Sequence, residues 1–164
     1  MSPSGLALAA VAAWEGGWWL RRRARRGLLY REAAAAAMAL GRPLVVVGAP
    51  DAGPTGGYGC GDVTVDLAPS QCPGYLRADV TRPLPWPDDS VVVLVSCVLE
   101  YVDDVEAALA ELRRVSGGWL WVARVEPCTL TAHLYPGARR TLPASVERPA
   151  WVEIPTWSPA QAAA

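Results

Sequence analysis

The segment SVVVLVSCVLEYVDDVEAALAELRRVSGGWLWV, residues 90–122, decides the fold class. It begins with an apolar, β-branched run, which we interpret as a central strand over about 91–96 because such runs are typical of strands buried on both faces of a sheet. Residues 103–118 then predict a helix, with Asp103 as its N-cap and Gly117-Gly118 as its end. The apolar face of this helix comprises Val105, Ala108, Leu109, Leu112 and Val115. A further strand is predicted at 119–125, and strand–helix–strand order is typical of a parallel sheet.

Three more strands are predicted upstream of this unit. LVVV at 44–47 and DVTVDL at 62–67 are short apolar runs, and YLRAD at 75–79 is a third candidate. The proline-rich segment 83–89 is expected to be a loop, since proline disrupts both helix and strand. The resulting order of elements predicts an α/β fold with a mostly parallel sheet.

The rest of the chain is expected to flank this domain. Residues 1–41 predict an N-terminal helical arm with a break at Gly16-Gly17, residues 42–148 the α/β domain, and residues 149–164 a C-terminal tail. Beyond Pro127 the pattern weakens, although 129–135 and 151–154 could form further short strands.

Composition excludes several function classes. With 52% apolar and 19% charged residues, the 164-residue chain fits a single folded domain. The net charge of −1 provides no overall field that would attract nucleic acid. The chain has no lysine, so every basic side chain apart from one histidine is an arginine, which cannot serve as a general base or form a Schiff base.

The four cysteines do not have the spacing of a metal site. Cys60, Cys72, Cys97 and Cys128 include no CxxC pair, and with His133 as the only histidine we expect no metal. Disulfides are not favoured either, because no secretory signal is recognised. We therefore expect four reduced thiols in a cytoplasmic protein.

The N-terminal arm combines an apolar run, residues 5–20, with an arginine cluster. A signal peptide has its positive charges before the apolar run, and a membrane span needs about 20 apolar residues without an interruption such as Glu15. Membrane attachment is therefore not favoured, although a helix docked on a membrane surface through 5–26 remains an alternative. We expect the tryptophans to pack on the domain or on a partner, which would allow an oligomer; these are Trp14, Trp18 and Trp19. Nucleic-acid contact is possible through the arginines but is not favoured over a solvated helix face; they are Arg21, Arg22, Arg23, Arg25 and Arg26.

The segment from about 42 to 126 resembles class I S-adenosylmethionine-dependent methyltransferases, and within them the small type 11-like branch. The resemblance depends on an ordered series of motifs: Leu84-Pro85, Asp88-Asp89-Ser90, Leu99-Glu100-Tyr101-Val102, Glu111-Leu112-Arg113-Arg114-Val115 and Gly117-Gly118. It implies a Rossmann-like, mostly parallel sheet of order 3-2-1-4-5. It also implies a shortened first crossover, in which a glycine-rich loop replaces the first helix between strands 44–47 and 62–67.

The resemblance further implies a cofactor, S-adenosylmethionine, and its binding residues. The methionine end would lie beside the loop residues Gly48, Ala49, Asp51 and Gly53. Asp66 would accept hydrogen bonds from the ribose hydroxyls, and Asp79 with Val80 would flank the adenine. Ser96 and Cys97 would form the floor of the site.

Each of these residues also has a purely structural interpretation. Asp66 could cap the turn that follows its strand, Asp79 could begin an ordinary turn, and the glycine loop could be a surface loop without a ligand. Glu100 and Tyr101 are weak catalytic candidates on the acceptor side, and otherwise a helix-entry charge and a packing aromatic. His133 could act as a general base but lies outside the matched segment.

Two functions follow from these interpretations. The first is a methyltransferase that uses S-adenosylmethionine on an unidentified acceptor; this direct displacement needs alignment of the reactants and no catalytic dyad. The second is a catalytically inactive methyltransferase-like domain that serves as a binding or assembly module. The partner would accordingly be a small-molecule methyl acceptor or a protein.

Overall fold

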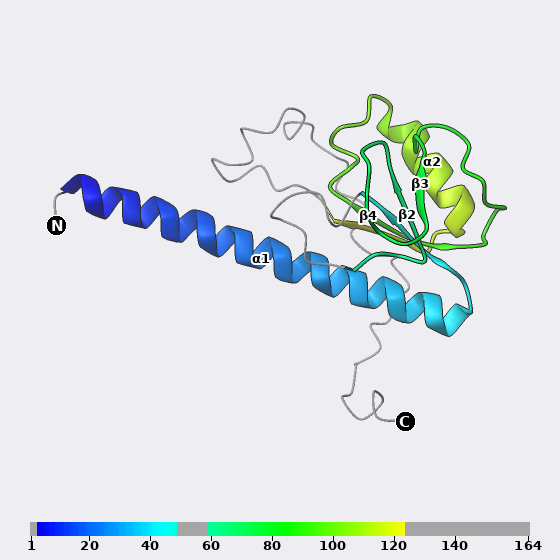
Figure 1. Cartoon of the computed structure of the whole chain (residues 1–164), viewed down its shortest axis with the longest axis horizontal. Coiled ribbons are helices and arrows are strands. Elements are labelled where there is room, and N and C mark those ends of the chain that lie inside the picture. The colour runs from blue at the N-terminus through cyan, green and yellow to red at the C-terminus, as the bar shows by residue number, and fades with distance from the viewer. Residues whose placement is uncertain (1–2, 49–58, 124–164) are drawn as a thin grey trace, which may run out of the picture.

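The computed structural model describes residues 3–48 and 59–123, which form two helices and a five-stranded sheet. All strand pairs are parallel, and the order is β3-β2-β1-β4-β5, as expected from the sequence. The predicted strands are confirmed. Each observed strand is as long as the predicted one or a few residues shorter. The elements are α1 Pro3–Leu40, β1 Leu44–Val47, β2 Val63–Asp66, β3 Tyr75–Arg77, β4 Val92–Ser96, α2 Val105–Ser116 and β5 Leu120–Ala123 (Figure 1).

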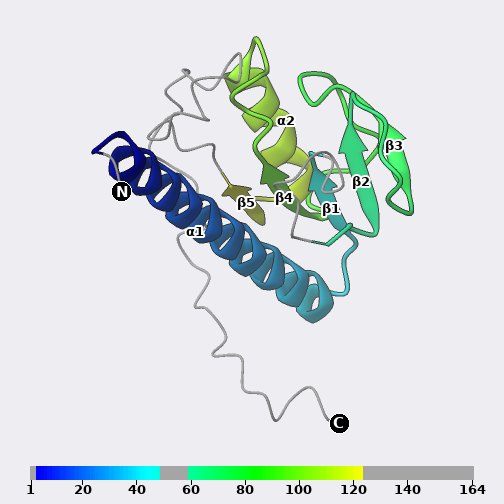
Figure 2. The ribbon, with the colours of Figure 1, turned by 60° about the vertical axis from the view of Figure 1, so that its left-hand side comes forward.

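The sheet lies between the two helices, with α1 on one face and α2 on the other (Figure 2). Alternation along the strands supplies both layers: Val45 and Val47 pack in the α2 layer, whereas Leu44 and Val46 pack in the α1 layer. Trp121, on β5, is fully buried in the α1 layer, where its indole N–H donates to the Glu32 carboxylate. Both faces of the central strands are therefore buried, which explains their continuous apolar sequence.

Helix α1 is a single 38-residue helix, so the predicted break at Gly16-Gly17 is wrong. A glycine inside a helix costs only about 1 kcal/mol relative to alanine, and the many alanines of this helix can offset that cost. Only the C-terminal part packs on the sheet, through Leu29, Ala33 and Ala37, spaced one helical turn apart. The N-terminal part projects beyond the sheet (Figure 1).

Helix α2 is stabilised at both ends. Its N-cap is Asp104, whose carboxylate accepts from the N–H of Ala107, so the predicted cap at Asp103 was one residue too early. Both residues are aspartates, and sequence alone could not distinguish them. At the other end, Gly117 adopts the left-handed conformation with φ of 58°, as expected for a helix that stops at a glycine pair.

Two of the cysteines form a disulfide, which corrects the expectation of four reduced thiols. Cys60 and Cys72 are bonded, with their Cα atoms 5.6 Å apart, whereas Cys97 is free. Cys60 precedes β2 and Cys72 precedes β3, so the bond joins the amino ends of two neighbouring strands. Cys128, His133, the two further candidate strands and the C-terminal tail lie outside the described residues.

The proline-rich loop at 83–89 is fastened to α2 by Glu111 and Arg114. The Leu84 N–H donates to the Glu111 carboxylate over 2.7 Å, and the Arg114 guanidinium bonds the same carboxylate, the Asp88 carboxylate and the carbonyl of Trp86. The hydrogen bonds from Arg114 are the main reason that the pKa of Glu111 is lowered.

Replacing Glu111 by glutamine is expected to reduce the free energy of unfolding by about 1.5–3 kcal/mol, the usual range for hydrogen bonds to a charged group. Because the pKa of Glu111 is lowered by folding, its contribution is fully present above the unfolded-state pKa of about 4.3 and is lost as the pH falls through the lower folded value. Urea unfolding at pH 7 and at pH 3 measures both effects. Glu106→Gln, the same change at an exposed site on α2, is the control. A difference between E111Q and wild type that did not depend on pH would contradict this assignment.

Candidate functional site

A cavity of about 330 Å³ lies at the carboxyl ends of β1, β2 and β4. The segment that follows β3 also lines it. The strand order reverses here, because the chain continues from β1 to β2 on one side and from β4 to β5 on the other. Open α/β sheets bind ligands in the crevice at such a point. The lining residues are Val47, Val65, Asp66, Leu67, Ala68, Ala78, Asp79, Val80, Cys97, Val98, Tyr101 and Val102.

Gly48 brings the end of β1 close to the end of β4. Its φ is +100°, and its N–H donates to the carbonyl of Val65 over 2.9 Å. A Cβ at this position would lie 2.5 Å from the carbonyl oxygen of Ser96 and 2.9 Å from Val98. The close packing of the two strand ends therefore requires glycine at this position. The other loop residues expected to contact a cofactor, Ala49, Asp51 and Gly53, lie outside the described residues.

Asp66 ends β2 and forms part of the cavity wall. Its side chain is half-buried, and one carboxylate oxygen accepts from the N–H of Ala68 over 2.8 Å. The structure thus contains the turn-capping contact that the sequence offered as the alternative interpretation. Turn capping and ligand binding by Asp66 are compatible, because the hydrogen bond from the Ala68 N–H holds the carboxylate in one orientation beside the cavity.

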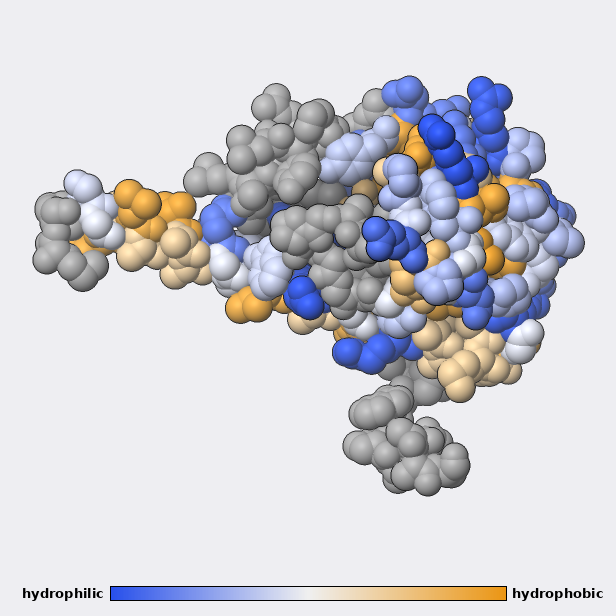
Figure 3. All heavy atoms as spheres, viewed as in Figure 1, coloured by the Kyte–Doolittle hydropathy of each residue, from blue (hydrophilic) through white to orange (hydrophobic). Residues whose placement is uncertain are grey.

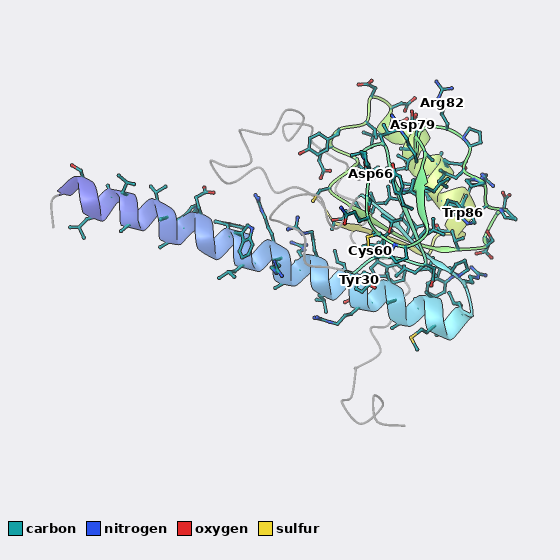
Figure 4. The ribbon with its side chains drawn as sticks, in the orientation of Figure 1. Tyr30, Cys60, Asp66, Asp79, Arg82 and Trp86 are labelled. Atoms are coloured by element: carbon teal, nitrogen blue, oxygen red, sulfur yellow. A yellow bond between two sulfur atoms is a disulfide. The ribbon has the colours of Figure 1, made fainter. Side chains whose placement is uncertain are left out.

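Asp79 lies on the same wall, beyond the end of β3 (Figure 4). Its carboxylate accepts from both the N–H and the hydroxyl of Thr81, at 2.9 and 2.7 Å. These hydrogen bonds, with the backbone one largest, lower the pKa of Asp79, so it is a carboxylate at neutral pH. The neighbouring Val80 is buried and lines the cavity, so the pair offers an acidic and an apolar surface side by side.

Cys97 occupies the floor of the cavity, directly after the buried Ser96 of β4. Its φ of 54° is unusual for a residue other than glycine, and its N–H donates to the carbonyl of Ala123 over 2.8 Å. Burial raises the pKa of the Cys97 thiol, despite an opposing effect from the guanidinium of Arg26. The thiol is therefore protonated at neutral pH and is a poor nucleophile.

The two weak catalytic candidates are placed differently. Tyr101 lines the cavity and is 44% exposed, so it lies at the mouth where an acceptor would approach. Glu100 is only 2% exposed and does not line the cavity. Its charge contributes to raising the pKa of the Cys97 thiol.

The sequence did not identify Arg26 as a residue of this region. Its guanidinium donates to the sulfur of Cys97 over 3.5 Å, so α1 reaches the carboxyl end of β4. No local pattern could have indicated this contact, because the two residues are 71 positions apart and meet only when α1 packs across the sheet. Thr81, which orients Asp79, could have been found from the Asp-x-Thr spacing typical of a side-chain-capped turn.

A larger hollow, of about 570 Å³, lies at the opposite end of the sheet, beside the C-terminal end of α1. Its polar groups already take part in structural contacts. Tyr30 donates to the carbonyl of Cys60 (Figure 4), Asp62 accepts from Leu44, and Arg42 pairs with Asp89. We therefore favour the smaller cavity as the functional site. Within the described residues, no three His, Cys, Asp or Glu side chains are grouped so that they could hold a metal ion.

The part of the chain that forms most of the cavity is similar to a known family. Residues 60–122 match the family model described as a methyltransferase domain. The sheet order agrees with that assignment. Together, the match and the parallel sheet support a class I methyltransferase domain in this part of the chain. The match spans β2 to β5, less than half of the chain, and it includes every described cavity residue except Val47. Searches of curated proteins and of solved structures found no significant match to this chain.

Proposed function

We propose that this methyltransferase domain binds S-adenosylmethionine in the cavity beside Asp66 and transfers its methyl group to an acceptor. The observation that supports this most directly is the cavity itself, which lies at the reversal of strand order and has a carboxylate on its wall. A carboxylate there can accept hydrogen bonds from sugar hydroxyls, and it disfavours a phosphate in the same place.

The residues present fit such a ligand. Asp66 would bind the ribose hydroxyls, and Asp79 with Val80 would flank the adenine. Gly48 would allow close approach of the backbone, and Ala49, Asp51 and Gly53 would complete the methionine end. Cys97 would close the floor, whereas Ser96, which was expected beside it, is buried and does not line the cavity. Two carboxylates and a mostly apolar lining suit a nucleoside that carries a positive charge.

The chemistry requires little of the protein beyond alignment. S-adenosylmethionine would supply an activated methyl group, and the domain would hold an acceptor about 3–3.5 Å from it. Tyr101, exposed at the mouth, is the residue placed to contact an acceptor. The protonated Cys97 thiol would not compete for the methyl group, because the thiolate is the reactive form.

A second candidate function is a methyltransferase-like domain that serves as a binding or assembly module. The projecting part of α1 favours it, since Trp14 is 60% exposed and contributes nothing to the domain core. In that case the partner would be a protein, and the cavity could still bind the cofactor as a structural ligand.

Location in the cell also remains a proposal. Within the described part of the chain, neither helix is long and apolar enough to cross a membrane. The cytoplasm was expected from the sequence, but the Cys60–Cys72 disulfide argues against it, because thiols there are kept reduced. Alkylation of thiols in freshly lysed cells, followed by mass spectrometry of these cysteines, would decide the point.

Calorimetric titration with S-adenosylmethionine tests the proposed function. We expect saturable binding, and a ten- to hundredfold weaker affinity for Asp66→Asn, because hydrogen bonds to a charged acceptor contribute about 1.5–3 kcal/mol. Asparagine can still cap Ala68, so the fold should be retained. Glu106→Gln, an exposed carboxylate-to-amide change on α2, is the control. Absence of binding at millimolar ligand would exclude the enzyme, and unchanged affinity in D66N would mean that the ribose lies elsewhere.

A further inference from the structure

The N-terminal part of α1 is exposed on the surface although it is apolar. The helix extends past the sheet before its packed stripe begins at Leu29, and Figure 3 shows apolar side chains on the projecting end of the helix. The exposed large side chains here are Leu6, Leu8, Val11, Trp14, Trp19 and Leu20, with Leu8 at 74%. The expected packing of the tryptophans on the domain is not seen for Trp14 and Trp19. A surface of this kind and extent indicates an interaction site.

Residue types change along the axis of this helix. The residues from Gly5 to Trp14 form an apolar tip, which is about 15 Å long along the helix axis. The hydrocarbon core of a bilayer is roughly 30 Å thick, so one leaflet has about the same thickness as the tip is long. Next comes a segment with Trp14, Trp18 and Trp19, and then an arginine cluster that begins at Arg21. Apolar, then tryptophan, then basic is the order found across one membrane interface.

The apolar side chains surround the helix. At about 100° per residue, Val11 and Leu20 lie on opposite sides, and Leu6 and Leu8 lie about 160° apart. One partner helix covers a single stripe, so pairing with a second copy of α1 would leave most of these side chains in water. Lipid covers a helix on all sides.

The charge of the segment suits an anionic surface. Residues 4–31 contain six arginines and one acid, Glu15, in a chain whose net charge is −1. Arg21 lies over the ring of Trp18 at 5.4 Å and Arg23 over that of Trp19 at 5.5 Å, so the cations are held next to the aromatic segment. Guanidinium groups bind phosphates well, and Glu15 lies at the level of the tryptophans, where a charge remains hydrated.

We infer that the projecting part of α1 docks on the surface of an anionic phospholipid bilayer. The tip, 5–14, enters one leaflet at an angle, the tryptophans lie at the interface, and the exposed arginines, Arg21, Arg23 and Arg25, contact lipid phosphates. Arg26 contacts Cys97 on the cavity floor, so the helix leaves the domain at the edge that carries the cavity. Docking in this way turns that edge toward the membrane.

Vesicle flotation of the full chain tests this inference without any methyl donor, so its outcome is independent of the proposed function. Vesicles of phosphatidylcholine alone are compared with vesicles that contain phosphatidylserine. We expect flotation with the second kind. Leu6→Ser with Leu8→Ser should weaken partitioning about tenfold or more, because buried apolar area is lost. Arg21→Gln with Arg23→Gln should weaken it about thirtyfold.

Matched controls come from the same chain. Met38→Ser with Leu40→Ser changes two exposed apolar residues at the other end of α1, and Arg77→Gln with Arg113→Gln removes two exposed charges elsewhere. Both controls should float like the wild type. Absence of flotation, or equal flotation without phosphatidylserine, would overturn the inference. A dimer that forms without lipid and dissociates in L6S/L8S would also overturn it. The same holds for binding to an RNA oligonucleotide that requires Arg21 and Arg23 but not Leu6 and Leu8.

Discussion

Alanine in place of Gly48 is expected to lower the free energy of unfolding by about 3–5 kcal/mol, as the sum of backbone strain and overpacking. The strain arises because Gly48 has a φ of +100°, where side chains are disfavoured. The overpacking arises because the new Cβ would lie 2.5 Å from the carbonyl oxygen of Ser96. That carbonyl belongs to a central strand buried on both faces, so it has little freedom to move away.

Urea unfolding measures this loss, and Gly16→Ala provides the control. Gly16 lies in the exposed part of α1, where a Cβ would have no atom within 4 Å. There alanine should leave the domain as stable as before or slightly more stable, since it favours helix. If G48A unfolded at the same urea concentration as the wild type, the ends of β1 and β4 would have to be farther apart than the structure places them.

The sheet could be predicted from sequence because its strands are buried on both faces. Continuous β-branched runs such as LVVV at 44–47 and VVLVS at 92–96 have few alternatives in a chain of this composition. Strand order followed only from the family resemblance. The helix ends were predicted to within a residue where glycine or aspartate marked them, and the choice between Asp103 and Asp104 needed coordinates.

The course of α1 could not be predicted in the same way. Gly16-Gly17 is a plausible break by local rules, yet the helix continues through it. The tryptophans were expected to pack on the domain or on a partner. Only the structure shows that the packed stripe begins at Leu29 and that the preceding part lies beyond the sheet.

The site was predictable where it depends on strand ends. Asp66, Asp79 and Cys97 were expected at the carboxyl edge, and all three line one cavity. Their role toward a cofactor is still a prediction. The contact of Arg26 with Cys97 and the burial of Glu100 arise from packing between distant segments, which no local pattern reports.

The disulfide, by contrast, corresponds to a regular spacing in the sequence. Cys60 stands three residues before β2 and Cys72 three residues before β3. Neighbouring parallel strands begin at the same edge of a sheet, so equal offsets before two adjacent strands place the side chains together. Neither the cysteine spacing of zinc sites nor the assumption of a reducing compartment predicts whether these two cysteines are bonded.

Removing this disulfide, by Cys60→Ser with Cys72→Ser, is expected to lower the free energy of unfolding by about 2–3 kcal/mol. The bond closes a loop with a sequence separation of 12, which contains the whole of β2. In the chain-entropy description, opening a loop of this size gives the unfolded chain freedom worth about 3 kcal/mol. The native state should change little, because the Tyr30 hydroxyl still holds the carbonyl of Cys60.

Urea unfolding with and without a reducing agent separates this effect from any effect of the other thiols. The wild type should lose stability on reduction, whereas the double serine variant should unfold at the same urea concentration in both conditions. Cys97 and Cys128 are present in both proteins, so any contribution from them appears in both and cancels. A wild type insensitive to reduction would show that Cys60 and Cys72 are not bonded in solution. The amino ends of β2 and β3 would then be held together by the sheet hydrogen bonds alone.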